Sequence, residues 1–404
     1  MKKILKRKFN KSIKFVNSGY LLIFAAVLGL VMANLPTYNI FTQFSEHQIY
    51  LPFYINLSME KLAEDGLLTI FFLNVGLDLK HELLFGPFNN KKKAVLPIIS
   101  AAGGVIVPAL VFLFIVFFTG QFQIFASGWA ISSVTDIALS LAVLSFIFSK
   151  NNSKIDKLSA KSSKTFLMTL AVADDIFGIL IITFFYSRSV NFIYLLFAFI
   201  IVCVWRFFSR FDSSFKWIIL VPLGLAAWYF TFRSGVHTAI IGVVLGLAII
   251  SLPKKGNWKS RIVKYRDFTD IFSKIFVLPI YIFFKMRINF FEIFNDILNS
   301  QISQSAGLVL VAIAAALMIG KPLGIFSFTY IFNRWTPFVL EKSLNLKFLL
   351  GVSCLAGIGF TVSFLIADLS FISPIVVSAS RLGIIIGSVF SGFFGYLVFK
   401  KTNK

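Results

Sequence analysis

The feature that most limits how this chain can fold is a series of long, nearly uninterrupted apolar stretches. We count about a dozen of roughly 17–25 residues, the length that an α-helix needs to cross the hydrocarbon core of a bilayer. Of the 404 residues, 58% are apolar and 14% are charged, whereas soluble domains are about half apolar and about one quarter charged. This pattern excludes an ordinary soluble enzyme, a disordered chain and a nucleic-acid-binding domain. It predicts an all-α polytopic membrane protein.

The predicted spans are the apolar stretches themselves, and the least apolar of them are the second and the ninth. They centre near residues 26, 71, 105, 137, 176, 198, 224, 244, 277, 314, 358 and 390. The first span follows a basic N-terminal stretch, as in a signal peptide, but the run from Tyr20 to Ala33 lacks a small-x-small cleavage site after it. We therefore expect a retained first helix.

Basic residues gather in alternate loops between the predicted spans. The basic segments are 91–93, 150–164, 206–216 and 254–266, and the segments poor in Lys and Arg are 34–60, 119–124, 187–190 and 232–236. The positive-inside rule places the basic loops and both termini in the cytoplasm, which requires an even number of spans. The segment 285–303 is a mild exception, because it should be external yet carries Lys285 and Arg287. Membrane orientation and anionic lipid head groups thus account for the net charge of +22.

Four charged residues interrupt the apolar stretches: Asp136, Asp174, Asp175 and Lys321. A charge inside a membrane helix is costly and usually functional. One buried ion pair could simply hold two helices together, but three acids and one base exceed that need. Carboxylates and hydroxyls suit a small hard cation or a proton. Because adjacent helical residues point about 100° apart, one of the two neighbouring aspartates can face a cavity while the other faces a partner helix.

Two of the apolar stretches contain a break. Ser-Ser-Val-Thr-Asp occupies residues 132–136, and Gly-Ile-Gly-Phe-Thr occupies residues 357–361. Non-helical backbone at membrane depth is tolerated only where it lines a cavity or is buried in protein. We expect two discontinuous helices that cross, with Asp136 near the positive N-terminal ends and Lys321 near the negative C-terminal ends.

The order of these features is mirrored between two parts of the chain. In the first part, the broken segment precedes the helix with the adjacent aspartates; in the second, the helix with the lysine precedes the broken segment. We expect one transporter domain over residues 1–404, with inverted repeats at about 94–187 and 305–399. Close helix packing is the alternative explanation of Gly357 and Gly359.

The motifs around these residues resemble those of the NhaA family of sodium/proton antiporters, in family order over about residues 18–395. They are the segment 71–83, Thr135-Asp136-Ile137-Ala138, Asp174-Asp175, Ser234-Gly235-Val236-His237, Gly320-Lys321-Pro322-Leu323-Gly324, Gly357-Ile358-Gly359-Phe360-Thr361 and Arg381-Leu382-Gly383-Ile384. The resemblance implies twelve membrane helices with inverted repeats and two crossed, discontinuous helices. It implies a secondary transporter of a bacterial inner membrane, not an enzyme, that exports sodium or lithium electrogenically in exchange for protons by alternating access, under control of pH.

The resemblance also implies roles for single residues. Asp175 is the principal sodium and proton carboxylate, and sodium binds at Asp175 and Asp174. Asp174 pairs with Lys321, and Thr135 and Asp136 lie at the crossing. The other broken helix supplies Gly357, Gly359 and Thr361. Glu82 and His237 match positions linked to pH response. The transported ions are the only small molecules implied, so no cofactor is expected, and the two cysteines and three histidines show no metal-ligand spacing.

The chain departs from the family pattern in three places, which puts its pH response in doubt. Ser132 and Ser133 replace Pro-Ala, and the segments 264–268 and 283–287 differ from the family. Glu82 could instead pair with Lys80 or Lys91, and His237 could be an ordinary interfacial histidine.

The family also suggests a homodimer, for which about 34–60, with an external β-hairpin, and 190–284 would supply the interface. Phe41, Ile49 and Tyr54 could equally lie at the membrane surface. The expected partners are therefore sodium, protons, the lipid bilayer and a second copy of the chain, and no nucleic acid.

Two other kinds of function compete with sodium/proton exchange. An intramembrane aspartyl protease needs two facing carboxylates that share a proton, and Asp136 and Asp174 could supply them, although that chemistry has no use for Lys321. A related transporter with another selectivity, such as one for potassium, is also compatible with the acids. A third alternative is a relative that has lost transport.

Overall fold

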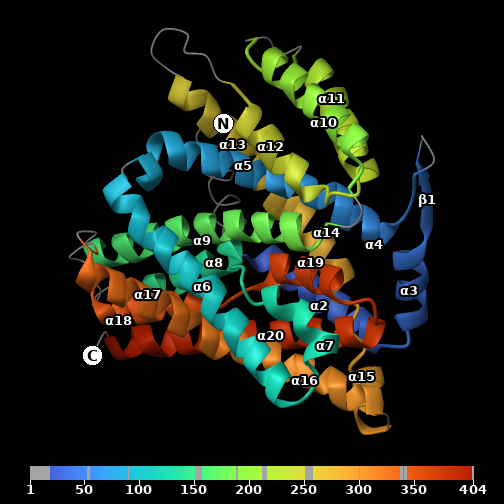
Figure 1. Ribbon diagram of the computed structural model, residues 1–404, viewed down its shortest axis with the longest axis vertical. Coiled ribbons are helices and arrows are strands. Elements are labelled where there is room, and N and C mark those ends of the chain that lie inside the picture. The colour runs from blue at the N-terminus through green and yellow to red at the C-terminus, as the bar shows by residue number, and fades with distance from the viewer. Residues whose placement is uncertain are drawn as a thin grey trace, which may run out of the picture.

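Helices form almost all of the chain, as expected where the backbone must satisfy its own hydrogen bonds in lipid. The computed structural model describes residues 19–402 apart from 52–54, 90, 151–156, 188–189, 212–215, 251–257, 300, 337–339 and 341–343. The basic residues before residue 19, those at 151–156 and 251–257, and Tyr54 lie outside the described residues. Figure 1 shows the arrangement of the described elements, with α9 (Lys157–Phe185) running through the middle.

The N-terminal part begins with two helices that meet at a sharp bend. α2 (Tyr20–Asn34) and α3 (Tyr38–Glu46) differ in direction by 115°. The antiparallel hairpin of β1 (Gln48–Leu51) and β2 (Ile55–Ser58) follows, with Gln48 opposite Ser58. The expected hairpin in segment 34–60 is thus present. Phe41 is buried within the protein, and its ring centroid lies 4.9 Å from that of Phe283.

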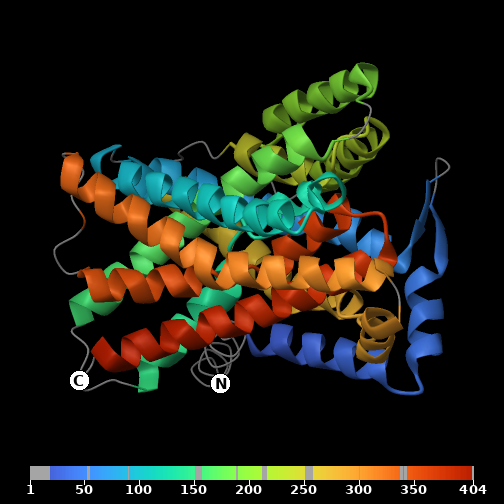
Figure 2. The ribbon, with the colours of Figure 1, turned by 60° about the horizontal axis from the view of Figure 1, so that its bottom comes forward.

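The largest group of helices surrounds α9 and forms the main apolar core. Its members include long helices that stack against one another in Figure 2. The elements of this group are α6 (Lys91–Phe118), α8 (Ile137–Lys150), α16 (Gln301–Ala315), η5 (Ala316–Gly320), α17 (Lys321–Trp335), α18 (Leu346–Ala356), α19 (Phe360–Ser370) and α20 (Pro374–Thr402). α6 and α17 cross closely, because a Cβ at Gly103 would lie 2.6 Å from the carbonyl oxygen of Gly324. Such contacts need small residues.

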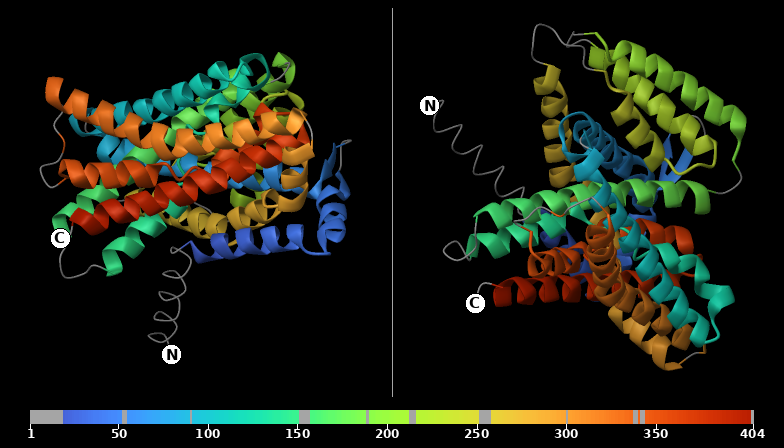
Figure 3. Two further views of the ribbon diagram at one scale, coloured as in Figure 1. Left: turned by 90° about the horizontal axis from the view of Figure 1, so that it is seen from below. Right: turned by 60° about the vertical axis from the view of Figure 1, so that its left-hand side comes forward.

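A second, smaller core joins the helices beyond α9. Figure 3 shows α10 and α11 as a hairpin at one edge of the molecule. Trp205 on α10 donates a hydrogen bond of 3.2 Å to the carbonyl oxygen of Leu245 on α12, which fixes the hairpin to the neighbouring helices. These elements are α5 (Leu68–Phe85), α10 (Phe192–Phe208), α11 (Lys216–Arg233) and α12 (Ala239–Ala248).

The remaining elements are short helices and irregular turns that extend or join the long ones. Two segments of π-helix lie within continuous helical stretches, where such widened turns often mark functional positions. These elements are α4 (Met59–Leu62), η1 (Ala63–Leu67), η2 (Pro87–Asn89), α7 (Phe122–Phe125), η3 (Ala126–Ala130), α13 (Trp258–Phe272), η4 (Ser273–Val277), α14 (Leu278–Lys285) and α15 (Phe290–Asn299). The two π-helical segments of this group are η1 and η4, and η5 in the main core is a third.

Length and apolarity identify fewer spans than the sequence predicts. Within the described part of the chain, four helices are long and apolar enough to cross a membrane, and up to six if each bent pair counts as one span. The protein is therefore helical with several membrane-span candidates. The count of about twelve spans stays a prediction.

A buried set of charges joins five elements near the hairpin. This Lys285 network consists of Glu60, Glu64, Lys285, Asp368 and Arg381. The Lys285 ammonium lies 3.1 Å from Glu60 Oε1, 2.7 Å from Glu64 Oε2 and 2.6 Å from Asp368 Oδ2. Arg381 lies 3.0 Å from Glu60 Oε1 and 2.8 Å from Asp368 Oδ1. Lys285 was an exception to the positive-inside rule, and its three acidic partners provide the reason: its charge is neutralised inside the protein.

Removal of Lys285 should destabilise the fold. Lys285→Met leaves three buried carboxylates without their shared cation, and breaking a buried pair typically costs about 3–5 kcal/mol. We expect a clear drop in the thermal unfolding midpoint of the detergent-solubilised protein, measured by tryptophan fluorescence. Glu46→Gln is the control, because the Glu46 side chain is 62% exposed and pairs with Arg287 rather than with a member of the network, and exposed pairs contribute about 0–1 kcal/mol. Equal midpoints for the two variants would contradict the role of the network.

Candidate functional site

The two breaks that the sequence indicates lie against each other. The first break (residues 131–136) separates η3 from α8, and the second break (residues 357–359) separates α18 from α19, which differ in direction by 47°. The backbone N–H of Asp136 donates to the carbonyl oxygen of Ile358 over 2.7 Å. Each break thus supplies a hydrogen-bond partner that the other needs in an apolar environment.

The Asp136 carboxylate joins the beginnings of two helices. Its Oδ1 accepts from the backbone N–H of Leu139 in α8 at 3.0 Å. Its Oδ2 accepts from Thr361 in α19, at 2.9 Å from the hydroxyl and 3.3 Å from the backbone N–H. A carboxylate here satisfies N–H groups that the first turn leaves free and complements the positive ends of both helix dipoles.

The second break is tightly packed, and the residue that directly follows it is strained. A Cβ at Gly357 would lie 2.6 Å from the carbonyl oxygen of Leu317, and one at Gly359 would lie 3.2 Å from Leu317 Cδ2. The glycines therefore allow close approach, which the sequence left as an alternative. Phe360 carries the left-handed backbone, with φ of 28°. A bulky residue in that region is strained, and such strain concentrates at functional sites.

Lys321 and Asp174 form a fully buried ion pair behind the first break. The ammonium lies 3.2 Å from Asp174 Oδ2 and donates over 2.8 Å to the carbonyl oxygen of Ser133. The Thr135 hydroxyl lies 2.5 Å from Asp174 Oδ2 and 2.7 Å from the Ala356 carbonyl oxygen, and it can donate its hydrogen to either. Asp174 thus has a positive counter-charge, and the Lys321 ammonium also binds a carbonyl oxygen that the broken backbone leaves free. Lys321 itself follows the π-helical turn η5.

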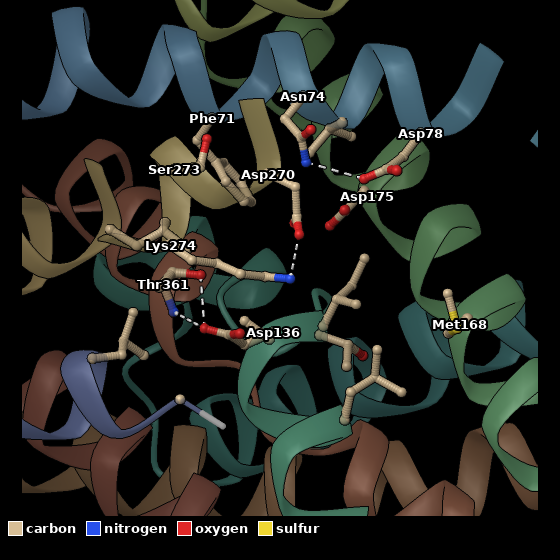
Figure 4. A pocket seen from close by; sticks show the side chains of 18 of the residues that line it. Phe71, Asn74, Asp78, Asp136, Met168, Asp175, Asp270, Ser273, Lys274 and Thr361 are labelled. Carbon is tan, nitrogen blue, oxygen red and sulfur yellow. Dashed lines mark hydrogen bonds and ion pairs between the residues drawn. The ribbon is translucent and has the colours of Figure 1, made fainter. Parts of the chain in front are cut away.

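Asp175 points the other way, into a cavity of about 380 Å³. The cavity is also lined by Thr135, Asp136 and Thr361, and Figure 4 shows Asp136 and Asp175 on its walls. Asp175 is 3% exposed, and among the described residues its Oδ2 has no hydrogen-bond partner. Each of the two aspartates has one oxygen without a hydrogen-bond partner among the described residues, but their surroundings differ: Asp174 is paired with a lysine and does not line the cavity, whereas Asp175 lines the cavity and has no ion pair in the described part of the chain.

α5, α13 and η4 form the opposite wall of the cavity, and most of its charged residues were not singled out by the sequence. The Asn74 amide donates to Asp78 Oδ2 at 3.1 Å, and Arg266 Nε lies 3.7 Å from Asp78 Oδ1. Lys274 Nζ lies 2.7 Å from Asp270 Oδ2. The only sequence signal for this last pair is an acid followed four residues later by a lysine on one helix, which is common on exposed helices.

His237 lies away from the cavity, in the connection between α11 and α12. Its Nδ1 accepts from the backbone N–H of Ala239 at 3.2 Å, so the neutral ring carries its proton on Nε2. That atom lies 3.7 Å from Asp65 Oδ1 and has no hydrogen-bond partner within the described residues.

Glu82 lies near the other end of α5, about 25 Å from Asp65 along the helix. Its Oε1 lies 3.8 Å from His81 Nδ1. Lys80 does not pair with it, because its ammonium donates to the Leu247 carbonyl oxygen at 2.9 Å. The Lys91 side chain lies outside the described part. The structure therefore brings neither pH-response candidate to the cavity or to the other.

Similarity to known proteins identifies the family of the chain. The model of the family described as Na+/H+ antiporter 1 matches residues 11–399. The chain belongs to that family. A protein named Na(+)/H(+) antiporter NhaA from Bifidobacterium adolescentis is 34% identical over 406 residues, covering 96% of this chain and 86% of its own length. A protein of the same name from Haemophilus influenzae is 34% identical over 395 residues, covering 96% and 93%.

Membership in the Na+/H+ antiporter 1 family, with the apolar helices described above, identifies a multi-pass membrane transporter rather than an enzyme. The similarity extends over nearly the whole chain, so it includes both breaks, both aspartates of the pair and Lys321. The family resemblance expected from the motifs is thus confirmed.

Loss of the Thr361 hydroxyl should weaken the join between the two breaks. Thr361→Val removes a donor to the buried Asp136 carboxylate, which typically costs about 1–3 kcal/mol. We expect a lower thermal unfolding midpoint in detergent, whereas Thr361→Ser, which keeps the hydroxyl, should melt close to the wild type. A Thr361→Val midpoint equal to that of Thr361→Ser would show that this hydrogen bond contributes nothing.

Proposed function

We propose that this protein exchanges sodium or lithium ions for protons across a bacterial inner membrane, with Asp175 as the carboxylate that binds both. The observation that carries the proposal is the free Asp175 oxygen in the cavity, next to an aspartate that a lysine already neutralises. Carboxylate and hydroxyl oxygens are suitable ligands for a small hard cation. Asp174, Asp136 and Thr135 complete the oxygen-rich surroundings in this proposal.

Competition at one carboxylate is enough to couple the two fluxes. Asp175 holds either a cation or a proton, so each change of access carries one of them across. High internal pH removes the proton and favours sodium, and low pH fills the site with protons and stops exchange. Glu82 and His237 would modulate this pH response from outside the cavity.

The buried Lys321 supports electrogenic exchange. A lysine held against Asp174 in an apolar site is a second group that can gain and lose a proton during the cycle. If Lys321 and Asp175 each release a proton when one sodium ion binds, each cycle moves net charge. The membrane potential can then drive export.

The proposed mechanism needs helices that are interrupted at the site. Contacts between the two breaks and the bent pair α18 and α19 support crossed, discontinuous helices, which can shift at the site without unsatisfied backbone. α6 packs on α9, and α16 packs on α20, which supports the proposed inverted repeats at about 94–187 and 305–399. Alternating access would then follow from movement of one part of the molecule against another.

The surroundings of the protein complete the proposal. Both termini are cytoplasmic, as the positive-inside rule requires. A homodimer would use the β-hairpin within 34–60 together with 190–284, in contact with the lipid bilayer.

Loss of Asp175 should abolish exchange. In everted vesicles that carry the protein and a pH-sensitive dye, we expect sodium and lithium to cause proton movement between about pH 6 and 9, and potassium to cause none. Asp175→Asn should remove the response, because an amide cannot exchange a proton. Glu292→Gln, on α15 and away from the cavity, is the control. Retained exchange in Asp175→Asn would contradict the proposal, and a response to potassium would favour the related transporter of different selectivity.

A further inference from the structure

Two lysines, Lys164 on α9 and Lys274, line the cavity together with Asp175, whereas Lys321 is not one of its lining residues. Lys274 and Asp270 both line it, and the Lys274 ammonium lies 2.7 Å from Asp270 Oδ2. Figure 4 shows the Lys274 side chain extending across the cavity, with its nitrogen on the Asp270 carboxylate and with Asp136 and Asp175 nearby. The two side chains are 27% and 32% exposed, so neither is fixed by complete burial.

The backbone that carries Lys274 is unusual. Lys274 lies in the π-helical turn η4, between α13 and α14. A π-turn is rare and energetically unfavourable compared with the α-helix, and it is often found at functional sites. Lys321, the lysine of the buried pair, directly follows another π-helical turn. A widened turn thus carries Lys274, and another directly precedes Lys321.

Arg266, the other cation on the cavity wall formed by α5, α13 and η4, already has acidic partners. Arg266 lies 3.1 Å from Asp267 Oδ1 and 3.7 Å from Asp78 Oδ1. Among the ion pairs of the described residues, Lys274 has one partner, which is Asp270. The Lys274 ammonium is a compact charge on a flexible four-carbon chain. If Asp270 releases it, the same chain can turn toward the two carboxylates that line the cavity.

We propose that Lys274 is a tethered competitor of the transported cation, and that Asp270 sets the apparent sodium affinity by holding Lys274 away from Asp136 and Asp175. The inference rests on the proposed function of Asp175. An ammonium and a sodium ion carry the same charge and are attracted by the same oxygens. Each lysine that approaches the carboxylates therefore reduces the sodium that they bind.

The test compares the sodium concentration for half-maximal exchange, KM, at one alkaline pH in everted vesicles. Lys274→Met removes the competitor, and we expect its KM to fall several-fold below that of the wild type. Asp270→Asn frees the competitor, and we expect its KM to rise several-fold. Lys274→Arg keeps the charge and its partner, so its KM should stay close to that of the wild type.

The double variant separates this explanation from simple attraction of sodium by Asp270. If Asp270 acts through Lys274, Lys274→Met with Asp270→Asn should have the low KM of Lys274→Met. If Asp270 attracts sodium by itself, the double variant should have a higher KM than Lys274→Met, and the inference is overturned. Thermal unfolding midpoints of all variants in detergent verify that each one folds.

Two further outcomes distinguish a failure of this inference from a failure of the proposed function. An unchanged or raised KM in Lys274→Met, with exchange still dependent on Asp175, would overturn the role of Lys274 and leave the proposed function standing. No sodium-dependent proton movement in the wild type would overturn the proposed function and this inference together.

Discussion

The hydrogen bond between the Asp136 N–H and the Ile358 carbonyl oxygen is the contact on which the rest of the site depends. A helix cannot be interrupted in an apolar environment unless other groups satisfy its free N–H and C=O groups. Here, each break supplies what the other lacks, and the Asp136 carboxylate holds the beginnings of α8 and α19 together. The strained Phe360 is retained within this arrangement. Polar backbone and side chains can therefore exist deep inside an otherwise apolar bundle.

The charged residues at the two breaks lie in different surroundings. Lys321 neutralises Asp174 and binds the Ser133 carbonyl oxygen, whereas Asp175 faces the cavity with a free oxygen. The Lys285 network keeps a second set of charges together at the far end of α19, where Asp368 meets Lys285 and Arg381. α19 thus begins at the two breaks and ends in the Lys285 network.

The sequence predicted the charged residues at the breaks because they stand in long apolar stretches, where a single aspartate or lysine is conspicuous. It did not predict the Lys285 network, since Glu60, Glu64 and Asp368 lie near helix ends, where acids are usual, and their partners are distant in the chain. Lys274 and Asp270 lie in the weakly apolar stretch near residue 277, and their spacing of four residues is common on exposed helices. The left-handed backbone of Phe360 was not predicted, because backbone angles depend on packing that no local pattern reveals.

The central claim is that sodium and protons compete for one carboxylate, and sodium binding to the purified protein tests it most directly. Isothermal titration calorimetry at alkaline pH, in buffers with different heats of ionisation, reports how many protons leave when sodium binds. We predict that the measured heat varies with the buffer for the wild type, because bound protons are released, and that Asp175→Asn gives no binding heat. Sodium binding with the same heat in every buffer, or undiminished binding to Asp175→Asn, would contradict the account.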